Sequence, residues 1–72
     1  MSERAALEIE VLSHRTRVAE LAATLADLER NIAEGVDAPA KLQREANLLR
    51  MELKGRAAAV EVGSARLRMI RD

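Results

Sequence analysis

The sequence lacks several residue types on which common functions depend. Its 72 residues include no cysteine, phenylalanine, tyrosine or tryptophan. Without cysteine the chain can form no disulfide and offers no thiolate to a metal ion, which also fits a reducing compartment. Without aromatic rings it has nothing to stack on the bases of single-stranded nucleic acid, which argues against that class of partner.

Long apolar runs are missing as well. The N-terminus mixes charged residues with alanine and leucine, unlike the apolar segment of a signal peptide. No stretch approaches the ~20 apolar residues that cross a bilayer. A helix lying on a membrane surface would be expected to carry aromatic anchors and a concentrated basic face, and neither is present. We therefore expect a cytoplasmic protein without membrane insertion.

Helix-breaking residues are scarce. The chain has one proline and three glycines, and Gly35 and Pro39 bracket the expected turn. Glycine is typical of the left-handed position that ends a helix, and proline is typical of a helix's first turn. We therefore predict a helix over 3–34, a turn over 35–38 and a helix over 39–71.

The predicted helix ends carry suitable capping residues. Ser2 is expected to cap the first helix, and Asp37 or Ala38 the second. Val36 is expected to supply the apolar contact that accompanies a glycine at a helix end. A turn this short returns the chain antiparallel. The predicted fold class is all-α: a single domain, 1–72, forming an antiparallel two-helix hairpin of coiled-coil type, completed by a partner or by dimerisation.

Apolar residues recur at alternating spacings of three and four along both predicted helices, the pattern of helices packed along a seam. When the chain folds back at the turn, six pairs lie level, and in each pair the two residue numbers add to 74. Two less apolar pairs, Val18 with Arg56 and Val11 with Gly63, predict that the half near the turn is firmer. We name this set the first line: Leu7, Val11, His14, Val18, Leu21, Leu25, Leu28, Ile32, Leu42, Ala46, Leu49, Leu53, Arg56, Val60, Gly63, Leu67 and Ile70.

The second predicted helix carries another apolar line with the same spacing, rotated by about 160–200° from the first. Either line suits the seam inside the hairpin. A helix that is apolar on two opposite faces cannot bury both against one neighbour, so one face is left for a partner. The first helix adds a flank of small residues beside its seam. The second line is Leu48, Met51, Gly55, Ala58, Val62, Ala65 and Met69, and the flank is Ala5, Leu12, Ala19, Ala26 and Ala33.

Charge is balanced overall but uneven along the chain. The formal net charge is zero, with four bases against seven acids in residues 1–36 and eight bases against five acids in residues 37–72. The halves therefore carry opposite charges, and we expect the two helices to attract each other, although exposed pairs contribute only about 0–1 kcal/mol each. The bases spread around the second helix instead of forming a stripe, so nucleic acid is not an expected partner.

No cluster of chemically active side chains stands out. His14 is the only histidine, and no second metal ligand lies at helical spacing beside it, so we interpret it as a half-buried structural residue. Ser13 points about 100° away from His14 and cannot serve it as a nucleophile. We interpret the carboxylates as a solvated face with pairs such as Glu52 with Arg56. We predict no catalytic, cofactor-binding or metal-binding residues and no enzyme activity.

Residues 21–53 resemble a known family, the small co-chaperones of type III secretion needle subunits (the YscE/PscE type). Members of that family are antiparallel helical hairpins of about this length. The resemblance lies in the spaced leucines and the turn that contains glycine. The residues that carry it are Leu25-Ala26-Asp27-Leu28, Ile32, Gly35-Val36-Asp37-Ala38, Leu42-Gln43-Arg44-Glu45, Leu49 and Leu53.

The resemblance implies a function. A member of this family binds and stabilises a tetratricopeptide-type chaperone, and the pair holds the needle subunit soluble before export. The protein would then be a non-enzymatic co-chaperone, in indirect contact with the needle subunit. Two alternatives remain open: a homodimeric four-helix-bundle adaptor, or a small accessory subunit of a larger enzyme such as a nuclease. The predicted partner-binding residues are Leu48, Met51, Gly55, Ala58 and Val62, with Leu12, Ala19 and Ala26 as a second possibility.

Overall fold

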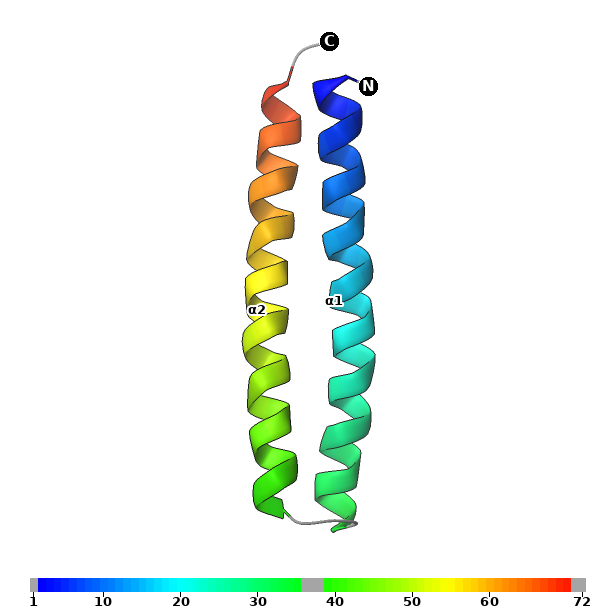
Figure 1. Cartoon of the computed structure of the whole chain (residues 1–72), viewed down its shortest axis with the longest axis vertical. Coiled ribbons are helices and arrows are strands. Elements are labelled where there is room, and N and C mark those ends of the chain that lie inside the picture. Colours follow the sequence, from blue (N-terminus) through cyan, green and yellow to red (C-terminus); the bar gives the residue numbers. More distant parts are fainter. Residues whose placement is uncertain (1, 36–38, 71–72) are drawn as a thin grey trace.

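The computed structural model describes residues 2–35 and 39–70, which form two long helices lying side by side (Figure 1). Helix α1 spans Glu3–Glu34 and helix α2 spans Pro39–Met69. The helices run antiparallel, so the start of α1 and the end of α2 lie at the same end of the molecule (Figure 1). The hairpin is a thin rod of 53 × 14 × 14 Å. The predicted all-α hairpin is therefore confirmed.

Both ends of α1 have the predicted caps. The hydroxyl oxygen of Ser2 accepts a hydrogen bond from the backbone N–H of Ala5 at 3.1 Å. Gly35 adopts the left-handed conformation, with φ 67° and ψ 31°, and its N–H donates to the carbonyls of Asn31 and Ile32. Glycine enters this conformation without the steric cost of a Cβ atom. The helix therefore begins and ends where the local chemistry of the sequence predicts.

Helix α2 begins at the predicted Pro39 but ends before the predicted residue. Its last residue is Met69, and Ile70 is not helical. The Ile70 N–H donates to the carbonyl of Leu67 at 3.3 Å, and the Ile70 carbonyl accepts a hydrogen bond from Arg4 at 3.0 Å. The bond from Arg4 joins the two helices through a carbonyl at the end of α2. The prediction of a helix to 71 is wrong at Ile70, because the helix has ended before that residue. The predicted turn residues Val36, Asp37 and Ala38, and Arg71, lie outside the described residues.

The first line forms the seam between the helices. Leu21, only 2% exposed, is the largest fully buried side chain. Every residue of the first line is buried or half-buried, whereas the large side chains of the second line remain in solvent. The first line is therefore the seam inside the hairpin. The half of the seam near the turn contains a contiguous cluster of buried residues. That cluster is Leu25, Leu28, Leu42 and Ala46, with Ile32, Leu49 and Leu53 packed against it.

The half of the seam farther from the turn closes around a glycine. Gly63 is buried opposite Val11, and a Cβ atom built on Gly63 would stand 2.5 Å from Cγ2 of Val11. Val11 and Leu7 are both buried there. Gly63 therefore lets the two helices approach closely, and it is a packing position and not a gap in the seam.

Charged contacts join the helices on both flanks of the seam. On one flank, Nη2 of Arg17 donates to both carboxylate oxygens of Glu52 at 3.3 Å. On the other flank, Nη2 of Arg50 donates to a carboxylate oxygen of Glu29 at 3.3 Å. Only the second pair has the predicted polarity, with the acid on α1 and the base on α2. These side chains are exposed, so each pair contributes about 0–1 kcal/mol.

Candidate partner-binding surface

The second line is exposed along α2. Leu48, Met51 and Val62 are 67%, 71% and 60% exposed, although each is a large apolar side chain. Gly55 and Ala58 lie between them and are exposed too. A series of exposed apolar side chains on one helix face is typical of a surface that another protein covers. The five residues predicted on α2 therefore share one solvent-exposed face.

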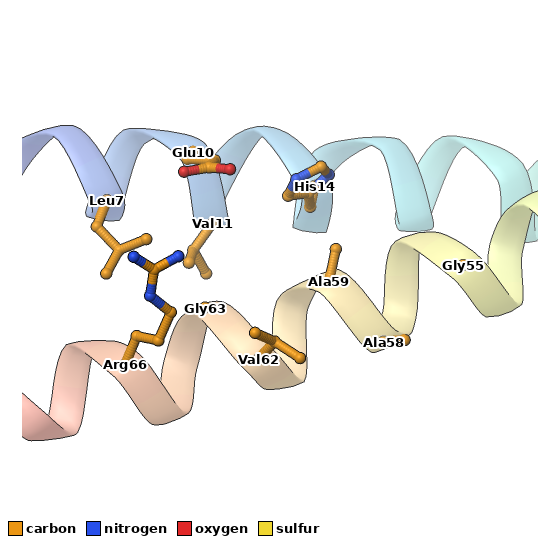
Figure 2. A pocket seen from close by; sticks show the side chains of 10 residues that line it. All are labelled: Leu7, Glu10, Val11, His14, Gly55, Ala58, Ala59, Val62, Gly63 and Arg66. Carbon is orange, nitrogen blue, oxygen red and sulfur yellow. The ribbon is translucent and has the colours of Figure 1, made fainter.

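A groove runs beside the second line in the half of the hairpin farther from the turn (Figure 2). Its volume is about 370 Å³, and each helix provides one wall. Three of the predicted partner-binding residues, Gly55, Ala58 and Val62, belong to the α2 wall. We name it the distal groove, and it is lined by Leu7, Glu10, Val11, His14, Gly55, Ala58, Ala59, Val62, Gly63 and Arg66.

The distal groove exists because α2 carries small residues where it approaches α1. The methyl group of Ala59 points toward α1, and nothing lies within 4 Å of a Cβ atom built on Gly55 (Figure 2). Arg66 extends toward α1 beside Leu7 and Val11 (Figure 2). The groove is therefore a largely apolar furrow that Glu10, His14 and Arg66 line as its polar residues.

His14 contacts Arg56 across the seam. Nη1 of Arg56 lies 3.0 Å from Nδ1 of His14, and both residues are half-buried. A guanidinium group has only donors, so Nδ1 must accept and the ring hydrogen belongs on Nε2. The predicted pair of Glu52 with Arg56 is wrong, because Glu52 bonds to Arg17 and Arg56 reaches His14. Among residues 2–35 and 39–70, no group of three or more potential metal ligands comes together.

The second predicted set lies on α1. Leu12 is 63% exposed, and Ala19 and Ala26 are exposed on the same helix. None of the three belongs to the lining of the distal groove. Leu12 instead contributes to a shallow hollow on α1 together with Ile9 and Thr16. The two predicted sets therefore form two separate surfaces.

Sequence reasoning missed one flank of the distal groove. Glu10, Ala59 and Arg66 line it, although none of them belongs to either apolar line. Each of the three comes directly before a residue of the first line. In an antiparallel hairpin, positions with this offset on both helices lie on the same flank of the seam. That shared offset is the signal in the sequence that identifies them.

The fold and this surface define the chain as an all-α helical hairpin that leaves one apolar face of α2 exposed. Neither of the described helices is long and apolar enough to cross a membrane. In comparisons with known proteins, no family model matches the chain, and no curated protein or solved structure shows significant similarity to it. Proposals about its function therefore rest on the geometry of the hairpin and on the residues of its sequence.

Proposed function

We propose that the protein is a non-enzymatic co-chaperone. In this proposal the second line of α2 binds and stabilises a tetratricopeptide-type chaperone, which holds a type III secretion needle subunit soluble before export. The observation that carries the proposal is the exposure of Leu48, Met51 and Val62 on one face of a helix whose opposite face forms the seam. A hairpin this thin cannot cover that face itself.

The spacing of the second line matches a known mode of recognition. An amphipathic helix binds a groove between other helices through residues spaced by three and four, and helical-repeat proteins offer such concave surfaces. The line extends from Leu48 to Met69, about 31 Å at a rise of 1.5 Å per residue. Methionine side chains adapt to irregular surfaces, and Met51 and Met69 both project into solvent. α2 therefore presents a suitable apolar face to a helical-repeat partner.

The polar groups near this surface support binding more than catalysis. Glu10, His14 and Arg66 are the polar side chains that line the distal groove. Nδ1 of His14 already accepts a hydrogen bond from Arg56. Acid–base and nucleophilic catalysis need several groups that converge on one reacting atom, and the rest of the lining is alanine, glycine, valine and leucine. The proposed activity is therefore binding.

Co-purification from the native host tests the proposal. The tagged full-length chain is expressed at its natural level, and the proteins that purify with it are identified by mass spectrometry. We expect a helical-repeat chaperone together with a small needle-type subunit. Val62→Glu should lose both proteins, because a carboxylate would be buried in the apolar interface without a partner. Leu12→Glu is the matched control: Leu12 is as exposed as Val62 but lies on α1, and this variant should retain both.

Three results would contradict the proposal. Recovery of the bait alone would leave the hairpin without the proposed partner. Recovery of a large enzyme would favour the accessory-subunit alternative. Loss of the chaperone from the Leu12→Glu bait, with retention by the Val62→Glu bait, would move the binding surface to α1.

A further inference from the structure

The second line is complementary to itself when two copies of α2 run antiparallel. We infer that in the free protein a second copy of the chain covers this line, in the register where facing residue numbers add to 113. In that register, residues 44–69 of the two helices overlap over about 39 Å. The facing pairs are Gly55 with Ala58, Met51 with Val62, Leu48 with Ala65, and Arg44 with Met69.

The register brings together side chains of suitable size. Gly55 and Ala58 lie nearest the twofold axis, and the space around Gly55 is open, so the two backbones can approach closely there. On either side of the axis, Met51 meets Val62, and both are large side chains that the hairpin leaves in solvent. The symmetry is isologous, so each pair of different residues occurs twice, and a residue at the axis faces its own copy once. Leu48, Met51 and Val62, which one copy leaves exposed, are therefore covered by the second line of the other, whereas Met69 faces Arg44.

This register also places one pair of opposite charges beside the line. Within the hairpin, facing seam residues add to 74, whereas the flanking pair Arg17–Glu52 adds to 69 and the pair Glu29–Arg50 adds to 79. The residue numbers of a flanking pair therefore add to five less or five more than those of a seam pair. The same offset between two copies of α2 places Glu52 opposite Arg66 of the second copy, and symmetry repeats this pair. Arg66 is exposed but extends toward α1 in the hairpin (Figure 2), so it would turn toward the second copy and share Glu52 with Arg17.

One flanking contact opposes the association. On the other flank, Lys54 faces Lys54 of the second copy near the twofold axis. Like charges on exposed, flexible side chains repel weakly, by amounts similar to a like-charged pair on one helix. The repulsion is also diagnostic of the register, because Lys54→Gln should tighten the dimer although it removes no contact within the hairpin.

The second copy and the proposed chaperone would occupy the same face of α2. The dimer would therefore protect the apolar line until the partner binds, and the two complexes would exclude each other. This inference concerns the free chain and does not depend on the identity of the chaperone. A chain that is monomeric at every concentration overturns the inference and leaves the proposed function in place.

Sedimentation of the purified full chain over a wide concentration range tests the association. A monomer has a mass of 7.9 kDa. We expect twice that mass at high concentration and dissociation on dilution, with a dissociation constant in the micromolar range, as is common for small interfaces (about 10⁻⁶ M). Val62→Glu should raise the constant at least ~10-fold, and Leu12→Glu should leave it unchanged. A dimer that Leu12→Glu dissociates and Val62→Glu does not would overturn the assignment.

Cross-linking tests the register, and the absence of native cysteine makes each introduced thiol unique. Lys54 is exposed and faces its own copy near the twofold axis, so Lys54→Cys should be bridged by a short bis-maleimide. Met69→Cys should not be bridged, because the antiparallel arrangement separates the two copies of that residue. Efficient bridging of Met69→Cys would show parallel helices, and failure of Lys54→Cys to cross-link would also overturn the register.

Charge exchange gives an independent test of the flank. Arg66→Glu should weaken the dimer, since the introduced carboxylate would face Glu52 of the second copy. Adding Glu52→Arg to the Arg66→Glu variant should restore dimerisation, although this change also removes the Arg17 contact within each hairpin. Far-UV circular dichroism and the urea midpoint show whether the hairpin remains folded in each variant. A double variant that stays folded and dimerises no better than Arg66→Glu contradicts the register.

Discussion

Val11 occupies the space that Gly63 leaves on the facing helix, so closely that a Cβ atom on Gly63 would stand 2.5 Å from Cγ2 of Val11. On the same helix, nothing lies within 4 Å of a Cβ atom built on Gly55. The two glycines have the same helical backbone but opposite surroundings. One substitution made at both positions therefore separates helix propensity from packing across the seam.

Gly55→Ala should stabilise the hairpin by about 0.5–1 kcal/mol, because alanine loses less conformational entropy than glycine in a helix. Gly63→Ala should instead destabilise it by about 1–3 kcal/mol, because the β-branched Val11 has few rotamers to which it can move. Urea unfolding of dilute protein measures both changes. Equal stabilisation by the two variants would mean that the close contact of Val11 with Gly63 does not constrain the seam.

Leu21→Ala should cost about 2–5 kcal/mol of unfolding free energy, because Leu21 is the most completely buried large side chain of the seam. Leu12→Ala removes the same atoms from an exposed position of the same helix and should change stability by no more than about 0.5 kcal/mol. Thermal and urea unfolding, followed by circular dichroism, compare the two. Similar losses in both variants would contradict the burial of the first line.

The contact of Arg56 with His14 is suited to a double-mutant cycle. Arg56→Leu leaves Nδ1 of His14 half-buried without its donor, and His14→Leu leaves the guanidinium without its acceptor. The double variant places two apolar side chains in the seam and should lose less stability than the sum of the single variants. We expect a coupling energy of about 0.5–1.5 kcal/mol. Additive effects in urea unfolding would show that the hydrogen bond contributes nothing to stability.

Met51→Glu should leave the free hairpin intact while it removes binding through the second line. Met51 is 71% exposed, so the folding free energy should change by no more than about 0.5 kcal/mol. Leu21→Glu, on the opposite line, should unfold the hairpin, because a carboxylate would enter the seam without a partner. Far-UV circular dichroism distinguishes the two. Loss of helix content in Met51→Glu at low concentration would place that residue in the core.

Ser2→Ala should destabilise α1 by about 1 kcal/mol, because the hydroxyl of Ser2 accepts the N–H of Ala5 at the helix start. Ser13→Ala is the matched control, since Ser13 is exposed in the middle of the same helix. Hydrogen exchange of the first-turn amides should rise in Ser2→Ala only. Unchanged exchange in that variant would show that the cap does not hold the first turn.

Much of the hairpin follows from local chemistry. Ser2, Gly35 and Pro39 mark helix ends, because capping, left-handed backbone and a fixed φ depend on single residues and their nearest neighbours. The alternating spacing of three and four predicts long helices packed along a seam, and the short turn makes them antiparallel. The end of α2 is the exception: Met69 is the last helical residue, and the Ile70 carbonyl accepts a hydrogen bond from Arg4, near the other end of the sequence.

The candidate surface could be predicted only in part. The exposed residues of α2 follow from the second line, but the distal groove also needs Glu10 and Ala59, which belong to different helices and to neither line. Their proximity depends on how closely the helices approach. That distance is set by Gly63 and Val11: the register predicts that the two residues face each other, but it does not predict how closely they pack.

Periodicity and helix caps act within a few residues, and they suffice to predict the helical hairpin, the two ends of α1 and the residues that share a face. Which of the two similar apolar lines of α2 is buried depends instead on how the two helices pack. Both lines have the same period, and the difference arises from side chains of α1 meeting one face: Val11 against Gly63, and His14 bonded to Arg56. Burial is a property of the pair of helices, so the pattern of one helix alone cannot assign it.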